Sequence, residues 1–187
     1  MASHDFQAAL SRLVGKRCWN AIAGRGTGSH FILDFGEKVP RDQRLENPSL
    51  TATERRFRGE VSLFVECAWR LDSSKEVICG WGDSNAPGGA MVRGLRSLVG
   101  RRVSGVSVEH PARDLEVHFD DMVLRMFCER TSQADHGSNY SVFAWRSPLR
   151  GVWEGWVFAV DALGRLRREP LTPSGRALTS VRTGRHR

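Results

Sequence analysis

The chain of 187 residues has no apolar run long enough to cross a membrane and no export signal. A membrane span needs about 18 consecutive apolar residues, whereas the most apolar stretch, GVWEGWVFAV at residues 151–160, carries Glu154 in its middle. The N-terminal stretch MASHDFQAALSRL contains Asp5 and lacks the apolar centre of a secretory signal. We therefore expect a cytoplasmic protein with no membrane contact.

Closely spaced cysteine pairs are also absent. The chain has four cysteines and none of them belongs to a C-x-x-C pair: Cys18, Cys67, Cys79 and Cys128. Structural zinc sites usually show two ligands at short spacing, so the sequence predicts neither a metal nor another cofactor. Without an export signal we expect these cysteines to be reduced thiols packed in the interior.

No segment carries a recognisable catalytic signature. The glycine-rich stretch GRGTGS at residues 24–29 precedes a strand-like segment, whereas phosphate-binding glycine loops open a helix. Several carboxylates lie in or beside predicted strands, where a solvated strand face is the simpler interpretation: Asp34, Glu66, Asp114, Glu116 and Glu129. We predict no catalytic residues, and the sequence favours a protein that is not an enzyme.

Lysine is scarce, and the positive charge is unevenly placed. The net charge is +7, and residues 164–187 hold seven arginines and one glutamate, so +6 of that charge lies at the C-terminal end. The remaining chain is close to neutral, which argues against a folded basic surface for nucleic acid. Residues 170–187 lack apolar periodicity and are predicted to be a disordered basic tail.

A short motif occurs twice, as LVGKR at residues 13–17 and as LVGRR at residues 98–102. The apolar residues before the two motifs share the i, i+4, i+7 spacing of one helix face: Phe6, Leu10 and Leu13, and Met91, Leu95 and Leu98. Gly15 and Gly100 stand where a glycine ends a helix. The repeated unit is therefore predicted to begin with an amphipathic helix followed by a strand.

Alternating apolar residues predict further strands in both halves. HFILDFG at 30–36 matches DLEVHFD at 114–120, and later matches are Leu63, Val65 and Cys67 with Leu124, Met126 and Cys128, and Ile78 and Trp81 with Val142 and Trp145. Short turns favour antiparallel pairing. Each half is predicted to be one helix plus about four mostly antiparallel strands.

We therefore predict an internally duplicated α+β protein that forms a single domain over residues 1–169. The first repeat spans 3–86 with an insert at 37–60, the second spans 88–147, and 150–169 form a C-terminal hairpin with Gly164 in its turn. Neither half would bury its sheet well alone, so we expect one cooperative unit.

The second half carries a longer pattern of motifs. L-G-x-x-V falls at Leu98, Gly100 and Val103, D-L-x-L-x-F at Asp114, Leu115, Val117 and Phe119, L-x-x-F-C at Leu124, Phe127 and Cys128, and N-Y at Asn139 and Tyr140. This pattern resembles a widespread bacterial family of small, cytoplasmic, uncharacterised proteins, some of which are similar to immunity proteins encoded beside secreted toxins. The first half matches the pattern weakly. The resemblance implies the fold and a partner that is another protein, such as a toxin.

Tryptophan and arginine mark the candidate binding residues, because both are enriched among residues that dominate protein interfaces. Trp81 and Trp145 stand at strand ends, and Asn139, Tyr140 and Arg146 are close to Trp145 in sequence. Four of the five arginines in the long insert join these candidates: Arg41, Arg44, Arg55 and Arg56. Loops of this length are usually functional or disordered, so we expect the insert to form part of a partner-binding surface.

The sequence thus predicts a non-catalytic binding protein of unknown specificity, and the resemblance implies an immunity-type protein that sequesters a partner protein. Two alternatives stay open. One is a nucleic-acid-associated protein that uses the arginine-rich tail. The other is a small-ligand binder or enzyme with a cleft between the two repeats.

Overall fold

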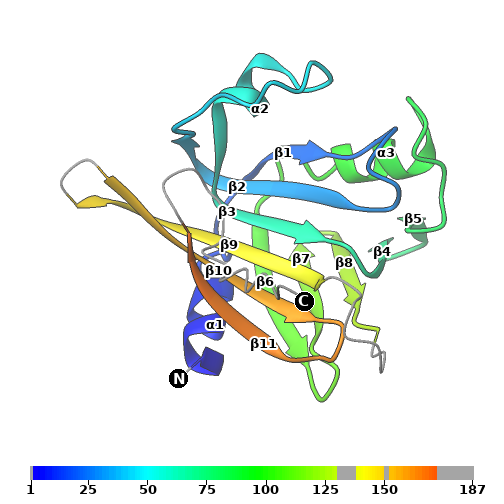
Figure 1. The fold of residues 1–187 in the computed structure, drawn as a ribbon. Coiled ribbons are helices and arrows are strands. Elements are labelled where there is room, and N and C mark those ends of the chain that lie inside the picture. Colours follow the sequence, from blue (N-terminus) through cyan, green and yellow to red (C-terminus); the bar gives the residue numbers. More distant parts are fainter. Residues whose placement is uncertain (1, 130–137, 150–151, 172–187) are drawn as a thin grey trace, which may run out of the picture.

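The computed structural model describes residues 2–129, 138–149 and 152–171 (Figure 1). In chain order their helices and strands are α1 (Ala2–Ser11), β1 (Cys18–Ile22), β2 (Phe31–Pro40), α2 (Ala52–Arg56), β3 (Phe57–Val65), β4 (Ala68–Ser73), β5 (Val77–Gly80), α3 (Ala90–Arg96), β6 (Val103–Glu109), β7 (Asp114–Phe119), β8 (Met122–Phe127), β9 (Ser138–Leu149), β10 (Val152–Asp161) and β11 (Leu166–Leu171). No helix among these is long and apolar enough to span a bilayer.

The strands form two antiparallel sheets, so the predicted α+β class with antiparallel strands is confirmed. The six-stranded sheet has the order β1-β2-β3-β9-β10-β11, and the five-stranded sheet has the order β5-β4-β8-β7-β6. β10 and β11 form the predicted hairpin around Gly164, whose φ is 71°. β10 also pairs with β9, so this hairpin completes the larger sheet.

Each sheet takes strands from both halves of the chain. In the six-stranded sheet, β3 from the first half pairs with β9 from the second, and in the five-stranded sheet β8 pairs with β4. Both junctions are antiparallel, and both bring together strands far apart in sequence. The two sheets therefore cannot be separated into an N-terminal and a C-terminal unit.

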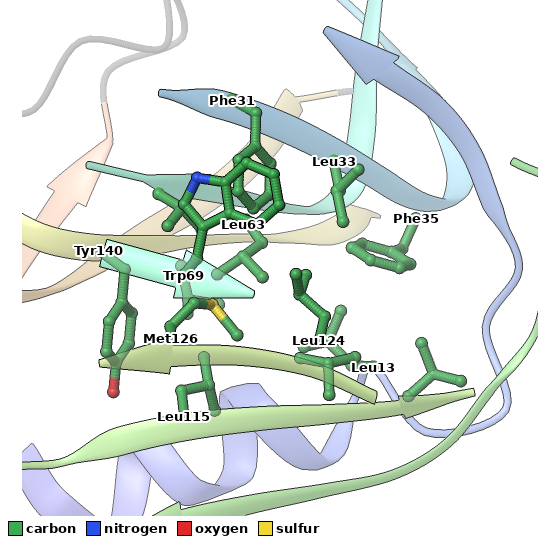
Figure 2. Close-up of a cluster of buried hydrophobic side chains, with 14 of the residues drawn as sticks. Leu13, Phe31, Leu33, Phe35, Leu63, Trp69, Leu115, Leu124, Met126 and Tyr140 are labelled. Atoms are coloured by element: carbon green, nitrogen blue, oxygen red, sulfur yellow. The ribbon is translucent and has the colours of Figure 1, made fainter. Parts of the chain in front are cut away.

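The main core lies between the two sheets, and α1 and α3 pack against the strands (Figures 1 and 2). Side chains of β2 and β3, such as Leu33 and Leu63, point toward those of β7 and β8, such as Leu115 and Leu124 (Figure 2). The apolar members of the predicted alternation are buried here because successive side chains of a strand point to opposite faces. Three of the four cysteines are buried and all four are free.

The two copies of the repeated pentapeptide lie side by side. Leu13 and Leu98 are both 0% exposed, and Gly15 and Gly100 have φ values of 82° and 92°, as expected of helix-ending glycines. Arg17 and Arg102 form an antiparallel bridge. Four backbone hydrogen bonds surround it: Gly15 N to Val103 O at 2.8 Å, Gly100 N to Cys18 O at 2.7 Å, Cys18 N to Arg101 O at 2.9 Å, and Val103 N to Lys16 O at 2.9 Å.

The predicted insert is less irregular than its sequence suggested. β2 continues to Pro40 and β3 begins at Phe57, so only residues 41–56 leave the sheet, and α2 lies within them (Figure 1). Thr51 and Glu54 form a capping box that starts this short helix. The register of β2 against β3 shifts between Phe35 and Lys38, at a bulge that contains Gly36 with a φ of 74°. The bulge moves later side chains of β2 to the opposite face.

Most of the predicted disordered tail, residues 172–187, lies outside the described residues. The tail was expected to start at residue 170, but β11 extends through Pro170 to Leu171, which is buried.

Candidate functional site

A pocket of about 200 Å³ opens in the outer face of the six-stranded sheet, the face turned away from the main core. Its lining comes from β2, β3, β9 and the loop after β2: Ile32, Asp34, Arg41, Arg58, Ser62, Phe64, Phe143 and Trp145. Along β2, β3 and β9, the side chains that line the pocket alternate with side chains that point into the core. The pocket therefore combines an apolar wall with two guanidinium groups and one carboxylate.

Asp34 forms the base of the pocket and is 1% exposed. One carboxylate oxygen accepts hydrogen bonds from the Gly59 amide at 3.0 Å and from the Ser62 hydroxyl at 2.6 Å. The other accepts from Nδ2 of Asn20 at 2.9 Å. A buried carboxylate with three donors is well compensated, so Asp34 ties β1, β2 and β3 together.

Trp145 is 1% exposed and lies against Arg58, whose guanidinium carbon is 3.4 Å from the indole centroid. This is a close cation–π contact, and it covers a face of the guanidinium. Gly155, opposite Trp145 on β10, leaves room for the ring, since a Cβ atom there would lie 2.7 Å from Cε3 of Trp145. A second small core surrounds the indole: Val39, Val157 and Leu171, with Phe143 packed against it.

Arg41 reaches the pocket from the start of the loop and is held by the backbone. Its Nε donates to the carbonyl oxygens of Glu54 at 3.3 Å and Phe57 at 3.1 Å, and its amide donates to the Arg56 carbonyl at 2.9 Å. Burial lowers the pKa of Arg41, and the charge of Asp34 partly offsets this. The guanidinium is therefore fixed in place by neutral acceptors.

The two arginines of the pocket repel each other. Burial lowers the pKa of Arg58 to about 10, and the neighbouring charge of Arg41 contributes to the decrease. Asp42 opposes it weakly, because its carboxylate is 4.0 Å from Arg58 and half exposed. The site is thus a concave surface in which two guanidinium groups lie near the carboxylates of Asp34 and Asp42.

The structure brings together only two of the predicted binding residues, Arg41 and Trp145, in this pocket. Arg44 and Arg56 are exposed on the adjoining loop, and Arg146 is exposed on β9 next to Trp145. Arg55 is half-buried, and its Nε atom is buried with no hydrogen-bond partner among the described residues.

Trp81 belongs to another part of the surface. It is 57% exposed and lies after β5, at the edge of the five-stranded sheet. There it lines a shallow depression together with Arg70, Val77 and Phe127. Trp81 and Trp145 therefore do not share one surface, although the sequence comparison paired them.

Asn139 and Tyr140 are buried and serve the fold. Both side-chain ends of Asn139 are engaged: Nδ2 donates to the carbonyls of Glu129 and Asp161, and Oδ1 accepts from the Glu129 amide. The Tyr140 hydroxyl donates to the Arg113 carbonyl at 2.9 Å. Neither residue offers a polar group to a partner.

Sequence reasoning missed Asp34, Arg58 and the apolar wall. Asp34 alternates with Leu33 and Phe35, and a solvated strand face was the natural interpretation. The only local signal for Arg58 was the glycine that follows it, Gly59, where a Cβ atom would lie 2.5 Å from the Val61 carbonyl. This close approach marks an irregular strand.

Two of the three described arginines near the C-terminal end are paired within the protein. Arg167 contacts Asp161 at 2.9 Å, and Arg168 contacts Asp5 at 2.8 Å and stacks on Trp156. Comparison with known proteins adds no relative, because no family model, curated protein or solved structure matches the chain.

Proposed function

We propose that this chain is a non-catalytic binding protein of the immunity type, which sequesters a partner protein such as a toxin. The partner would contact the outer face of the six-stranded sheet and the loop of residues 41–56. The observation that carries this proposal is the pocket in that face, where Arg41 and Arg58 lie among aromatic side chains. Arginine and aromatic residues are enriched at the centres of protein interfaces.

The outer face of the five-stranded sheet differs and serves as an internal comparison. Its charged side chains pair with one another in a chain of contacts: Arg70 with Asp72 at 2.7 Å, Asp72 with Arg125 at 3.0 Å, and Arg125 with Glu116. Glu116 also lies 3.2 Å from Nε2 of His118. Charges that compensate each other in this way leave little for a partner to gain. The aromatic side chains of its pocket favour the six-stranded face as the binding surface.

The state of the thiols supports a function without catalysis. Burial raises the pKa of Cys18 and of Cys67 to about 12, and that of Cys79 to about 11. Burial also raises the pKa of Cys128. A cysteine nucleophile reacts as the thiolate, so the raised pKa values disfavour these four thiols as nucleophiles.

A matched pair of variants tests the binding surface. The chain would be co-expressed with the product of the adjacent gene, and the complex isolated by size exclusion. Phe64→Ser alters the apolar wall of the pocket, whereas Val123→Ser is the control on the outer face of the other sheet. We expect the first to weaken the complex by about tenfold or more and the second to leave it unchanged. Equal affinities, or a small ligand that stabilises a chain with no protein partner, would overturn the proposal.

We also infer that the two halves are related by an internal duplication in which they exchange strands. The sheet orders support this inference. If α1 to β5 correspond to α3 to β10, then β1-β2-β3 followed by β9-β10 has the same order as β6-β7-β8 followed by β4-β5. In this correspondence the counterpart of β9 is β4, so Val142 matches Leu71 rather than Ile78.

The hydrogen bonds between the repeated motifs support the same inference. The bond from Gly15 N to Val103 O becomes the bond from Gly100 N to Cys18 O when the halves are exchanged, and the other pair is related in the same way. The guanidinium of Arg17 donates to the Gly100 carbonyl, and that of Arg102 donates to the Gly15 carbonyl. Such reciprocal contacts are typical of a two-fold axis.

A further inference from the structure

We propose that the two copies of the repeated pentapeptide together bind an acidic protein segment, in which carboxylates stand beside apolar side chains. The residues that would contact this segment are Val14, Arg17, Val99 and Arg102, called the motif surface below. The motif surface shares no residue with the pocket in the six-stranded sheet. It is therefore a second binding surface, and the inference does not depend on the proposed function.

The fold explains only part of the repeated motif. Its leucines fill the core and its glycines end the helices, but the second and fifth residues of both copies lie at the surface. Val14 is 48% exposed and Val99 is 44% exposed, and Arg17 and Arg102 are exposed as well. The same two positions are therefore available for contact in each copy.

Arg17 and Arg102 stand directly opposite each other in their antiparallel bridge. The amide of the residue after each arginine donates to the carbonyl of the residue before the other one. This is the pattern of a non-hydrogen-bonded pair, in which opposite Cα atoms are only about 4.5 Å apart and the two side chains leave the same face. Like charges directly opposite each other are destabilising. Carboxylates of a partner would offset this repulsion.

Neither of these two guanidinium groups forms an ion pair with a carboxylate of residues 2–129, 138–149 or 152–171. This includes Glu37 in β2 and Asp120 after β7, the exposed carboxylates on the adjoining strands. The basic residues that precede the two arginines differ, because Lys16 pairs with Glu60 at 2.7 Å and Arg101 pairs with Asp121. Within the motif, the exposed arginines are thus the cations that keep donors for a partner.

Each guanidinium group is fixed next to the exposed valine of the other motif. Arg17 donates to the carbonyl of the residue after Val99, and Arg102 donates to the carbonyl of the residue after Val14. These neutral acceptors orient the guanidinium groups without cancelling their charge. The motif surface therefore has two equivalent halves, each with a cation beside an apolar side chain.

This composition selects an acidic protein segment among the anionic partners. Planar guanidinium groups match carboxylates well, and apolar side chains next to those carboxylates would cover the valines. A nucleic-acid backbone would use the arginines through its phosphates but would leave the valines without an apolar contact. A second copy of this chain would bring the same positive charges to the surface and would be repelled.

Peptide titrations of the full chain at low salt test the inference. The probes would be N-acetyl-Glu-Val-Glu-Val-Glu-amide and its matched control, in which glutamine replaces each glutamate. Binding would be followed through the backbone amide resonances of Gly15 and Gly100. We expect the glutamate peptide to shift both resonances saturably and to bind about fivefold or more tightly than the glutamine peptide. Equal binding of the two peptides would overturn the inference.

Two double variants of equal charge locate the effect. Arg17→Gln with Arg102→Gln removes both cations of the motif surface, whereas Arg25→Gln with Arg165→Gln removes two exposed cations elsewhere. We expect the first variant to bind the glutamate peptide about fivefold or more weakly, while the second binds it like the wild type. Equal effects would contradict the inference, because the attraction would then follow the net charge of the whole chain.

A variant that keeps both arginines tests the apolar half of the surface. Val14→Ser with Val99→Ser should weaken binding of the glutamate peptide by about threefold or more, because it removes apolar contact area. It also decides the matter if the arginine variant does not fold. Unchanged binding would show that charge alone is recognised and would overturn the proposed acidic and apolar segment.

A short DNA duplex is the remaining probe. If the duplex shifts the two glycine resonances and the glutamate peptide does not, the motif surface is a nucleic-acid site and the inference fails. The proposed function has a separate fate, because Phe64→Ser alters the pocket and should bind the glutamate peptide like the wild type. A partner protein that Phe64→Ser loses, in a chain that binds no glutamate peptide, would leave the proposed function standing and overturn this inference.

Discussion

Gly155 leaves the space in which the indole ring of Trp145 lies, and that ring in turn supports Arg58. A Cβ atom at residue 155 would lie 2.7 Å from Cε3 and 2.9 Å from Cδ2 of Trp145, so Gly155→Ala must displace the ring. We expect a loss of about 1–3 kcal/mol in the free energy of unfolding, the usual cost of overpacking. Urea denaturation of wild type and variant measures this loss in the free energy of unfolding. Gly82→Ala is the control, because no atom lies within 4 Å of its added Cβ, and an unchanged midpoint for Gly155→Ala would contradict the packing described.

Glu60 couples the end of α1 to β3 through charge. Burial alone would raise the pKa of Glu60, but hydrogen bonds from Lys16 at 2.7 Å, Arg12 at 3.1 Å and the Glu37 amide lower it below 4.5 overall. A carboxylate whose pKa is lower in the folded state stabilises the fold above its unfolded pKa. This stabilisation is lost as the pH falls through the folded value.

The comparison of wild type with Glu60→Gln tests this coupling. We expect the wild type to be the more stable protein at neutral pH, and the difference to shrink as the pH falls from about 5 to about 3. Urea midpoints of the two proteins across this range provide the measurement. A difference that stays constant with pH would show that Glu60 acts by packing rather than by charge.

At the scale of helices and strands, the spacing of apolar residues was sufficient to predict an element where one of its faces is buried. Phe6 and Leu10 define the buried face of α1, and alternating apolar residues define β2 and β7, because each period is fixed by backbone geometry. The sequence did not indicate which strands pair with one another. β3 and β4 carry the same kind of alternation, yet they lie in different sheets. The sequence of a strand does not specify which other strand will pair with its edge.

The candidate site was predictable only in part for a related reason. Arg41 and Trp145 were marked by residue type, but the pocket that joins them depends on the bulge at Gly36 and on the register of β3 with β9. Both are set by tertiary packing. Asn139 and Tyr140 have the same residue types as interface residues, and only their burial reveals that they serve the fold.

The two motif leucines are expected to contribute equally to stability. Leu13 and Leu98 follow the ends of α1 and α3, and both are fully buried in the core between the sheets. Replacing either by alanine should cost about 2–5 kcal/mol, the usual range for a leucine in a packed core. Denaturant unfolding of the two variants decides the matter. A large cost for one and almost none for the other would argue against the proposed duplication.

The whole molecule should fold as one cooperative unit, because neither half contains a complete sheet. Without residues 88–187, β3 loses its partner β9, and β4 loses its partner β8. The remaining strands would expose both an unpaired edge and an apolar face. Such strands are rarely stable on their own in water. We therefore expect fragments 1–87 and 88–187, each expressed alone, to show no cooperative unfolding as monomers by circular dichroism.

Mixing the two fragments should restore the fold, since all contacts between the halves are non-covalent apart from the chain connection near residue 87. The restored complex should regain the near-ultraviolet signal of its buried tryptophans, Trp69 and Trp145. It should also unfold at a concentration-dependent midpoint, as expected when folding is coupled to association. If one fragment alone is monomeric and unfolds cooperatively, the halves are independent domains and the exchange of strands is not what holds the protein together.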